Sequence, residues 1–366
     1  MRASDADSVS APLLERIRAA VVEAGGWLPF DEYMRLVLYA PGLGYYARAE
    51  RAFGRWPTSG SDFVTAPELS PLFAQALAVQ LRQALRASDT ATLLEFGAGS
   101  GALAEGLLDA LSDAVDHYRI VEVSAALRAR QQQRLRRFGD RVRWLDTMPE
   151  GIDAVVIGNE VLDAMPVQLL AFDGHHWHQR GVALDARGEL TWSDRPSALR
   201  PPVEAAFAPG SVTELHLQAQ AFVTSLASWL RRGAAFFIDY GFPAAEYHHP
   251  QRSGGTLMCH RAHRADSEPL SEPGTKDITA HVDFTAIAVA AQDAGLHVLG
   301  YTSQARFLLN CGLLELMRDA APAQRAAAHL LLAEHEMGEL FKVIAFTKGC
   351  TFDAVGFAAG DRTHRL

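Results

Sequence analysis

The chain has 366 residues, 49% of them hydrophobic and 21% charged, and this ordinary composition excludes intrinsic disorder. A net charge of −9 disfavours broad binding to a phosphate backbone, so we expect no nucleic-acid partner. The three cysteines are far apart, the first residues resemble neither a signal peptide nor a transit peptide, and no run of about 18 apolar residues occurs. We therefore expect a soluble cytoplasmic protein without membrane insertion.

The first 90 residues predict a helical extension that includes a lid. Residues 10–24 place apolar side chains on one helical face, and a second short helix follows Pro29. The stretch after it is rich in Gly, Pro and aromatic residues, which is typical of a functional loop. Ser70 and Pro71 then predict the N-cap and first residue of a third helix.

From residue 91 the pattern changes to apolar strands that alternate with helices. The expected strands are 91–96, 118–124, 142–145, 153–161, 234–241, 297–303 and 341–349. Strands joined by crossover helices predict a mostly parallel sheet that is covered on both faces, which is an α/β fold.

The same pattern divides the chain into an extension at 1–90, a sheet domain at 91–349 and a tail at 350–366. Two insertions are expected in the sheet domain. One is an antiparallel meander at about 167–215, and the other is a polar segment at about 241–283 that is rich in His, Pro and Gly.

The glycines of LLEFGAGSGALAEG, at 93–106, follow a strand and open a helix. In this context Gly97, Gly99 and Gly101 let the backbone come close to a ligand. Two ligands fit. A dinucleotide would place its pyrophosphate on the helix N-terminus, as in G-x-G-x-x-A. The alternative is S-adenosylmethionine, which Glu95 favours because a carboxylate before the turn suits an ammonium group better than a pyrophosphate.

Two further acids follow the next strands. Glu122 stands at the end of the second strand, where a carboxylate can accept hydrogen bonds from ribose hydroxyls. Either adenosine ligand would use it. Asp146 follows the third strand and is equally consistent with a contact to an adenine amino group and with a capped turn.

Polar side chains also follow the fourth strand, in GNEVLDAMPV at 158–167. Asn159, Glu160 and Asp163 bring an amide and two carboxyls to the strand end, where open α/β sheets bind ligands. Carboxylates there suit the planar, permanently protonated guanidinium of arginine. His281, before an expected helix, is a candidate base or substrate contact.

The sequence offers little for other chemistries. No G-x-S-x-G elbow or Walker loop is present, and the His-rich residues 248–263 lack the spacing of metal ligands, so we expect no metal. The open alternatives are an NAD(P)-dependent oxidoreductase and a non-catalytic assembly or interaction protein that retains a donor site.

Seven segments in order resemble the MidA-like methyltransferases, whose mitochondrial member is an assembly factor of respiratory complex I. They are YMRLVLYAPGLGYYAR, DFVTAPELSPLF, LLEFGAGSGALA, GNEVLDAMPV, IDYGFPAAEYHHPQRSGGTL, DITAHVDFTA and MGELFKVIAFTKG. The resemblance spans about 15–349 and implies a class I, Rossmann-like methyltransferase fold with S-adenosylmethionine as the donor.

The resemblance also implies an acceptor, because the mitochondrial relative dimethylates an arginine of a complex I subunit. We therefore expect a protein substrate, with a respiratory NADH dehydrogenase subunit as one candidate, while a homodimer is one arrangement that the sequence allows. The segment DFVTAPE resembles the family's lid over the donor pocket, which adds Thr65 and Glu68 to the expected donor contacts. RWPTSGSDF is longer than the family's version of that loop.

Overall fold

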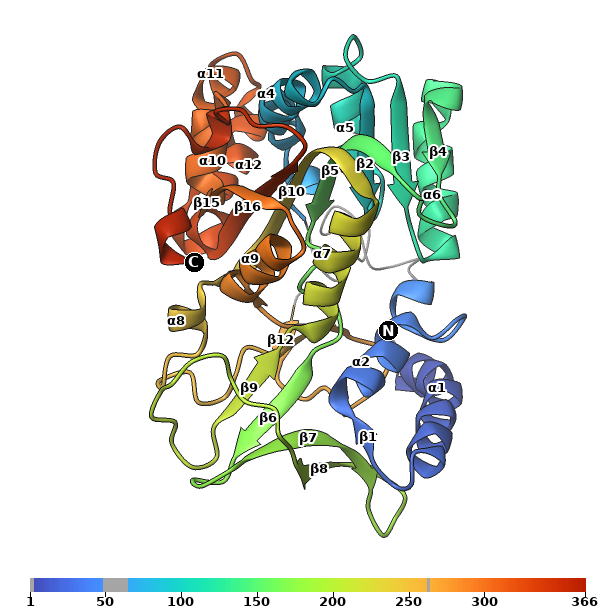
Figure 1. The fold of residues 1–366 in the computed structure, drawn as a ribbon. Helices are drawn as coiled ribbons and strands as arrows, with labels where there is room; N and C mark the ends of the chain where they lie inside the picture. The colour runs from blue at the N-terminus through green and yellow to red at the C-terminus, as the bar shows by residue number, and fades with distance from the viewer. Residues whose placement is uncertain (1–2, 49–64, 262–263) are drawn as a thin grey trace.

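The computed structural model describes residues 3–48, 65–261 and 264–366, and its largest element is a central sheet (Figure 1). The sheet contains seven main strands, and a short strand, β14 (Val282–Asp283), pairs with one of them. The seven are β2 (Thr92–Phe96), β3 (His117–Val121), β4 (Val142–Trp144), β5 (Ile152–Asn159), β10 (Leu230–Phe242), β15 (His297–Ser303) and β16 (Phe341–Lys348).

The order of these strands across the sheet is β4-β3-β2-β5-β10-β16-β15. All neighbouring pairs are parallel except the two that β16 makes, with β10 and with β15. The predicted α/β fold with a mostly parallel seven-stranded sheet is therefore confirmed. The chain leaves β2 in one direction towards β3 and β4 and returns to the other side at β5, so the β2/β5 boundary is the point where open sheets bind ligands.

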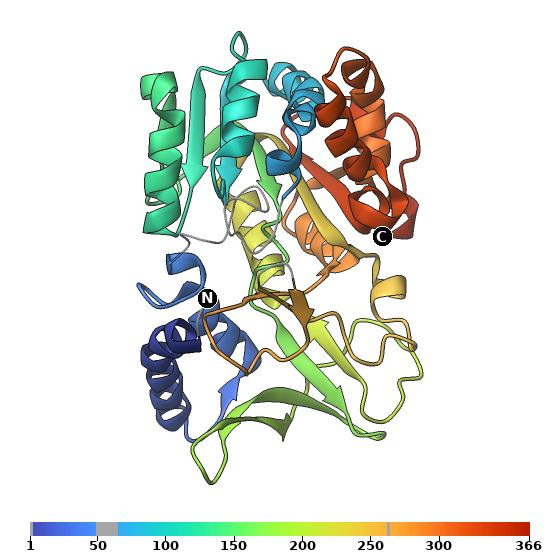
Figure 2. The same cartoon turned by 180° about the vertical axis from the view of Figure 1, so that it is seen from behind.

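Helices cover both faces of the sheet. Figure 1 shows α7 (Leu217–Trp229) and α9 (Phe284–Asp293) on one face. Figure 2 shows the helices of the other face, which are α4 (Pro71–Ser88), α5 (Ala102–Ala110), α6 (Ala125–Leu135), α10 (Gln304–Asn310), α11 (Leu313–Arg318) and α12 (Pro322–Leu332). The predicted start of α4 is observed, because Ser70 Oγ accepts a hydrogen bond from Leu72 N (3.3 Å) and Pro71 opens the helix.

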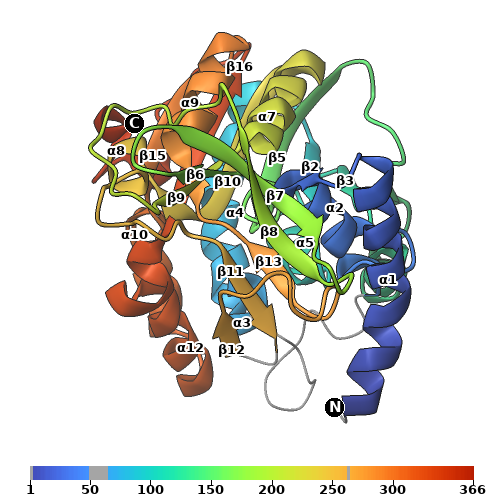
Figure 3. The same cartoon turned by 90° about the horizontal axis from the view of Figure 1, so that it is seen from below.

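A second body lies below the carboxyl ends of the parallel strands (Figures 1 and 3). It joins the N-terminal residues to the first insertion, because β1 pairs with β7 and both segments share one apolar core. Its elements are α1 (Ala3–Glu23), β1 (Leu28–Pro29), α2 (Phe30–Tyr39), β6 (Gln168–Phe172), β7 (Trp177–Leu184), β8 (Leu190–Pro196) and β9 (Val212–Leu215).

The second insertion connects the two bodies. It forms α8 (Ala244–Tyr247) and a small antiparallel sheet of β11 (Met258–Arg261), β12 (Arg264–Asp266) and β13 (Asp277–Thr279). A short helix, α3 (Ala66–Leu69), lies before α4. The domain boundaries that the sequence suggests stay a prediction.

Some boundaries differ from the expected ones. The first helix begins at Ala3, and the strand expected at 118–124 ends at Val121, because the Glu122 carboxylate accepts the Ser124 N–H (2.9 Å) and turns the chain. The residues after 350 fold back, with Phe357 buried in the core of the sheet domain. Among the described residues, no helix has the length and apolarity needed to cross a membrane.

Candidate active site

A cavity of about 910 Å³ lies between the carboxyl ends of the parallel strands and the second body. One part of its wall comes from the glycine turn and the ends of β2 and β3, and the opposite part from the residues after β5 and from β10, β13 and α2. Of the described residues that line it, the carboxyls are Asp31, Glu32, Glu95, Glu122, Glu160, Asp163 and Asp277, while Arg35 is the single Lys or Arg. The interior therefore favours cations.

The glycine turn after β2 requires glycine at all three predicted positions. Gly97, Gly99 and Gly101 have φ values of 61°, 53° and 81°, a region that side chains of L-residues disfavour. A Cβ at Gly97 would also lie 3.2 Å from Val161 Cγ2. The turn thus brings bare backbone to the cavity wall at the β2/β5 boundary.

A buried glutamine that the sequence did not single out fixes this turn. Gln131 of α6 donates through Nε2 to Gly99 O (3.0 Å) and to Glu122 Oε2 (2.8 Å). Its Oε1 accepts from Trp144 Nε1 (2.8 Å) of β4. Gln131 therefore fixes the position of the Glu122 carboxyl relative to the glycine turn. Gln131 stands in a polar run of residues, RQQQR, so no signal in the sequence distinguishes it.

Glu95 lies one residue before the end of β2 and is 2% exposed. Tyr118 Oη of the neighbouring strand donates to Glu95 Oε2 (2.8 Å). Burial raises the pKa of Glu95 to about 8, against the lowering effect of that hydrogen bond. A cation beside this carboxyl would favour its ionised form.

Glu160, after β5, has a left-handed backbone conformation (φ 54°), which glutamate disfavours. Its carboxyl accepts from Asn159 Nδ2 (2.9 Å at Oε1) and from the Ala66 N–H of α3. Burial, together with the nearby Asp163 charge, raises the pKa of Glu160 to about 8. Strain of this kind persists where the surroundings hold it and is concentrated at functional sites.

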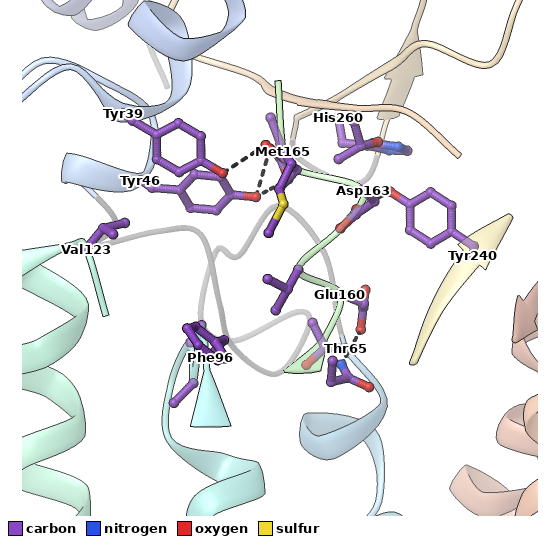
Figure 4. A pocket seen from close by; sticks show the side chains of 18 of the residues that line it. Tyr39, Tyr46, Thr65, Phe96, Val123, Glu160, Asp163, Met165, Tyr240 and His260 are labelled. Atoms are coloured by element: carbon purple, nitrogen blue, oxygen red, sulfur yellow. Dashed lines mark hydrogen bonds between the residues drawn. The ribbon is translucent and has the colours of Figure 1, made fainter. Parts of the chain in front are cut away.

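Asp163 is 4% exposed and accepts a hydrogen bond at Oδ2 from Tyr240 Oη (Figure 4). Burial raises its pKa to about 6. Two acceptor atoms here, Asp163 Oδ1 and Asn159 Oδ1, are buried and have no hydrogen-bond partner among the described residues. Buried acceptors without donors are costly, so this corner is suited to a ligand that brings N–H groups.

The loop that carries these residues is held by a carboxylate of β10. Asp239 Oδ2 accepts from the backbone N–H groups of Val161 (3.1 Å), Leu162 (2.9 Å) and Asp163 (3.3 Å). Asp239 is 1% exposed. An isolated acid inside the apolar run FFIDYG is the signal that could have identified it.

Aromatic side chains line several parts of the cavity, and Figure 4 shows two tyrosines at its upper left. Tyr39 and Tyr46 stack with ring centroids 5.5 Å apart, and Tyr46 Oη donates to Asp277 (3.0 Å). The predicted His281 also lines the cavity, with its ring 5.2 Å from that of Tyr240. Burial lowers the pKa of His281 to about 4, so the ring is neutral near pH 7.

Three other residues are predicted to contact S-adenosylmethionine, and the structure places only one of them on the cavity wall. Thr65 lines the cavity and is labelled near Glu160 in Figure 4. Glu68 is absent from the described lining residues, because its carboxyl accepts from Ser100 Oγ and from Arg134 Nη1 (3.1 Å) behind the glycine turn. Asp146 is also absent from them, since it is 78% exposed and paired with Arg128. Residues 62–64 of the expected lid lie outside the described ranges.

The His-rich segment is dispersed in the structure. His248 is buried and bonded to Thr213, His249 is exposed, and His260 lines the cavity, while His263 lies outside the described residues. In the described parts of the chain, no group of three or more His, Cys, Asp or Glu side chains is placed to hold a metal ion.

Comparison with known proteins identifies related chains. Residues 72–302 match the family described as "Putative S-adenosyl-L-methionine-dependent methyltransferase". The mitochondrial protein arginine methyltransferase NDUFAF7 homolog of Drosophila melanogaster is 29% identical, covering 94% of this chain and 87% of its own. The human NDUFAF7 is 26% identical, covering 93% and 84%.

Two solved structures are closer in sequence. A protein of Burkholderia thailandensis bound to S-adenosyl-homocysteine is 50% identical, with a TM-score of 0.96 and coverage of 100% of this chain and 99% of that one. A native structure from the same organism is 49% identical, with a TM-score of 0.91 and the same coverage. The predicted cytoplasmic location is contradicted, because the named NDUFAF7 relatives are mitochondrial proteins.

Proposed function

The chain belongs to the family of S-adenosyl-L-methionine-dependent methyltransferases that its match at 72–302 defines, and on this premise we propose that it methylates an arginine side chain of a protein. The family membership agrees with the MidA-like resemblance and sets the oxidoreductase alternative aside. The relatives that support arginine as the acceptor are 26–29% identical and are named as protein arginine methyltransferases.

The observation that carries the proposal is the set of unpaired acceptors beside Glu160. Asn159 Oδ1 and Asp163 Oδ1 are buried without donors among the described residues, and the Glu160 carboxyl lies beside them. A guanidinium supplies five N–H donors in a plane together with a charge that remains at every working pH. It therefore satisfies both the unpaired atoms and the negative charge, whereas a hydroxyl has a single O–H donor and no charge, and a carbon acceptor has neither.

The residues of the opposite wall fit the methyl donor. The three left-handed glycines leave room for a ligand against the backbone, Glu122 is available for ribose hydroxyls, and Glu95 for an ammonium group. Asp146, which is exposed, and Glu68, which is bonded to the glycine turn, are weaker candidates for direct contact. When bound, the donor supplies an electrophilic methyl group on a sulfonium.

In this arrangement the residues after β5 orient the acceptor and receive a proton. Glu160 and Asp163 would hold the guanidinium in one plane, so that one nitrogen faces the donor side of the cavity. Asp239 keeps this loop in place through three backbone N–H groups. Methylation removes one N–H proton, and the Glu160 carboxylate, whose pKa is raised to about 8, is suited to accept it.

Radiolabelled methyl transfer tests the proposal. The protein is incubated with labelled S-adenosylmethionine and a lysate of cells that lack its gene, and the labelled product is analysed by mass spectrometry. We expect label on an arginine of one protein, with a respiratory NADH dehydrogenase subunit as the first candidate. Label only on another residue type, or no label at all, would contradict the proposal.

We predict that methylation accelerates with rising pH. The guanidinium stays protonated, but Glu160 becomes a carboxylate only as pH approaches about 8, so acceptor binding strengthens over this range. At subsaturating concentrations of the protein substrate (the client), kcat/KM should rise by up to roughly ten-fold per pH unit between about 6 and 7.5 and then level off. A flat profile would contradict this role for Glu160. His281 cannot produce the rise, because its pKa is about 4.

Glu95→Gln should stabilise the unliganded protein at alkaline pH and weaken donor binding. The pKa of Glu95 is raised to about 8, so folding favours its protonated form, and this contribution is lost as pH rises from about 4.5 through 8. The variant should therefore have the higher Tm at pH 8.5 and an equal Tm at pH 5. Calorimetry should show a roughly ten-fold loss of affinity for S-adenosyl-homocysteine. Unchanged affinity would remove Glu95 from the donor site.

A further inference from the structure

The mouth of the cavity is lined by apolar side chains that are open to water. Val123, Met258 and Leu340 line the cavity and are 78%, 37% and 48% exposed. Val123 follows β3, Met258 opens β11 and Leu340 precedes β16, so three distant segments of the chain contribute exposed apolar side chains to the wall of one cavity. Single exposed apolar residues are ordinary, but several at the opening of one site indicate an interaction surface.

The interior of the cavity is acidic, in contrast to its apolar mouth. It presents seven carboxyls from the described residues, and Arg35 is already bonded to Glu32 through Nε (2.9 Å) and Nη2 (2.7 Å). The cavity is therefore complementary to one cationic side chain and unfavourable for an acidic segment. Met258 and Leu340 stand on the acceptor side, close in sequence to His260 and Phe341, which also line the cavity.

The depth of the carboxyls restricts the form of the partner. Asp163 is 4% exposed, so an arginine must enter the cavity with its whole side chain while its own backbone stays at the mouth. A residue on the flat face of a folded helix or sheet cannot do this without a clash. A protruding, extended segment can, and its neighbouring side chains then lie against the apolar mouth.

We propose that the client presents its arginine on an extended segment in which apolar residues flank the arginine, and that Met258 and Leu340 bind these neighbours. This inference rests on the proposed arginine methylation. Ordering an extended segment costs conformational entropy, and burial of flanking apolar side chains is the contribution that offsets it. The apolar mouth thus determines which arginines are methylated, while the acids inside determine that an arginine is required.

Two synthetic peptides test this proposal with the full chain and S-adenosyl-homocysteine. Each peptide has one arginine, flanked by Leu and Val in the first and by Ser and Gly in the second, and fluorescence anisotropy measures their binding. We expect the first to bind roughly ten-fold more tightly. Leu340→Ser and Met258→Ser should each reduce this preference to less than about three-fold.

Leu314→Ser is the matched control, because Leu314 of α11 is 50% exposed and is absent from the described residues that line the cavity. It should leave the preference unchanged. Equal binding of the two peptides, or a preference that survives both mouth variants, overturns the inference. Labelling of a client arginine in the lysate without binding of either peptide also overturns the inference and leaves the proposed function standing. If no client arginine is labelled in the lysate and neither peptide binds, the proposed function itself is overturned.

Discussion

Glu160→Gln should lower the rate of methyl transfer by roughly a hundred-fold or more, while affinity for S-adenosyl-homocysteine stays within about two-fold of the wild type. The substitution keeps the size of the side chain and can keep the hydrogen bond from Asn159, but it removes the charge that pairs with the guanidinium. It also removes the carboxylate that accepts the proton. Single-turnover assays with a labelled client would measure the rate, and calorimetry would measure donor affinity.

Two further variants separate this effect from damage to the fold. Glu204→Gln changes an exposed glutamate in the loop before β9 and should retain full activity. Glu160→Gly relieves the left-handed backbone at φ 54° but removes the acceptor of the Asn159 and Ala66 N–H groups, so its Tm should stay close to that of the wild type even though it abolishes transfer. If Glu160→Gln retained more than about a tenth of wild-type activity, the assignment of Glu160 as the residue that holds the acceptor would be wrong.

The sequence predicts those parts of the site whose signal is local. The glycine turn is such a case, because three glycines between an apolar strand and a helix are typical of a turn that approaches a ligand, and the structure gives all three a positive φ. The start of α4 is another, since Ser70 and Pro71 act within one helical turn. The sheet also follows from its pattern of apolar strands, although single boundaries move where a side chain such as Glu122 turns the chain.

What the sequence does not predict depends on contacts between distant segments. Gln131 connects α6 to the glycine turn, and Asp239 of β10 caps the loop after β5, but neither contact has a periodic signature. The same limit explains Glu68 and Asp146. Both stand at plausible positions in the sequence, yet tertiary packing pairs them with Arg134 and Arg128 and keeps their carboxyls off the cavity wall.

The short helix α3 connects the two halves of the site, because it contacts both Glu160 and the glycine turn. Ala66 N–H donates to the Glu160 carboxyl, and two residues later Glu68 bonds to Ser100 in the glycine turn. One short helix therefore contacts both the turn assigned to the donor and the acid assigned to the acceptor. A change in the glycine turn is for this reason expected to affect donor binding first and acceptor binding through α3.

Gly99→Val should abolish measurable binding of S-adenosyl-homocysteine, a loss of at least roughly a hundred-fold. Gly99 has φ 53° and lines the cavity, and its carbonyl accepts from Gln131 Nε2 (3.0 Å). A β-branched side chain disfavours this backbone by about 1–2 kcal/mol and fills space at the wall assigned to the donor. Isothermal titration calorimetry would measure the affinity, and thermal unfolding would measure the accompanying change in Tm.

Gly139→Val separates backbone strain from loss of the site. Gly139 has nearly the same φ, 58°, and a Cβ built there meets no atom within 4 Å. Both variants place valine at a positive φ, where L-residues are strained, so each should lose stability, but Gly139→Val should keep wild-type donor affinity. If both variants lost donor binding equally, strain alone would explain the loss at Gly99. If Gly99→Val still bound the donor, the glycine turn could not be its binding site.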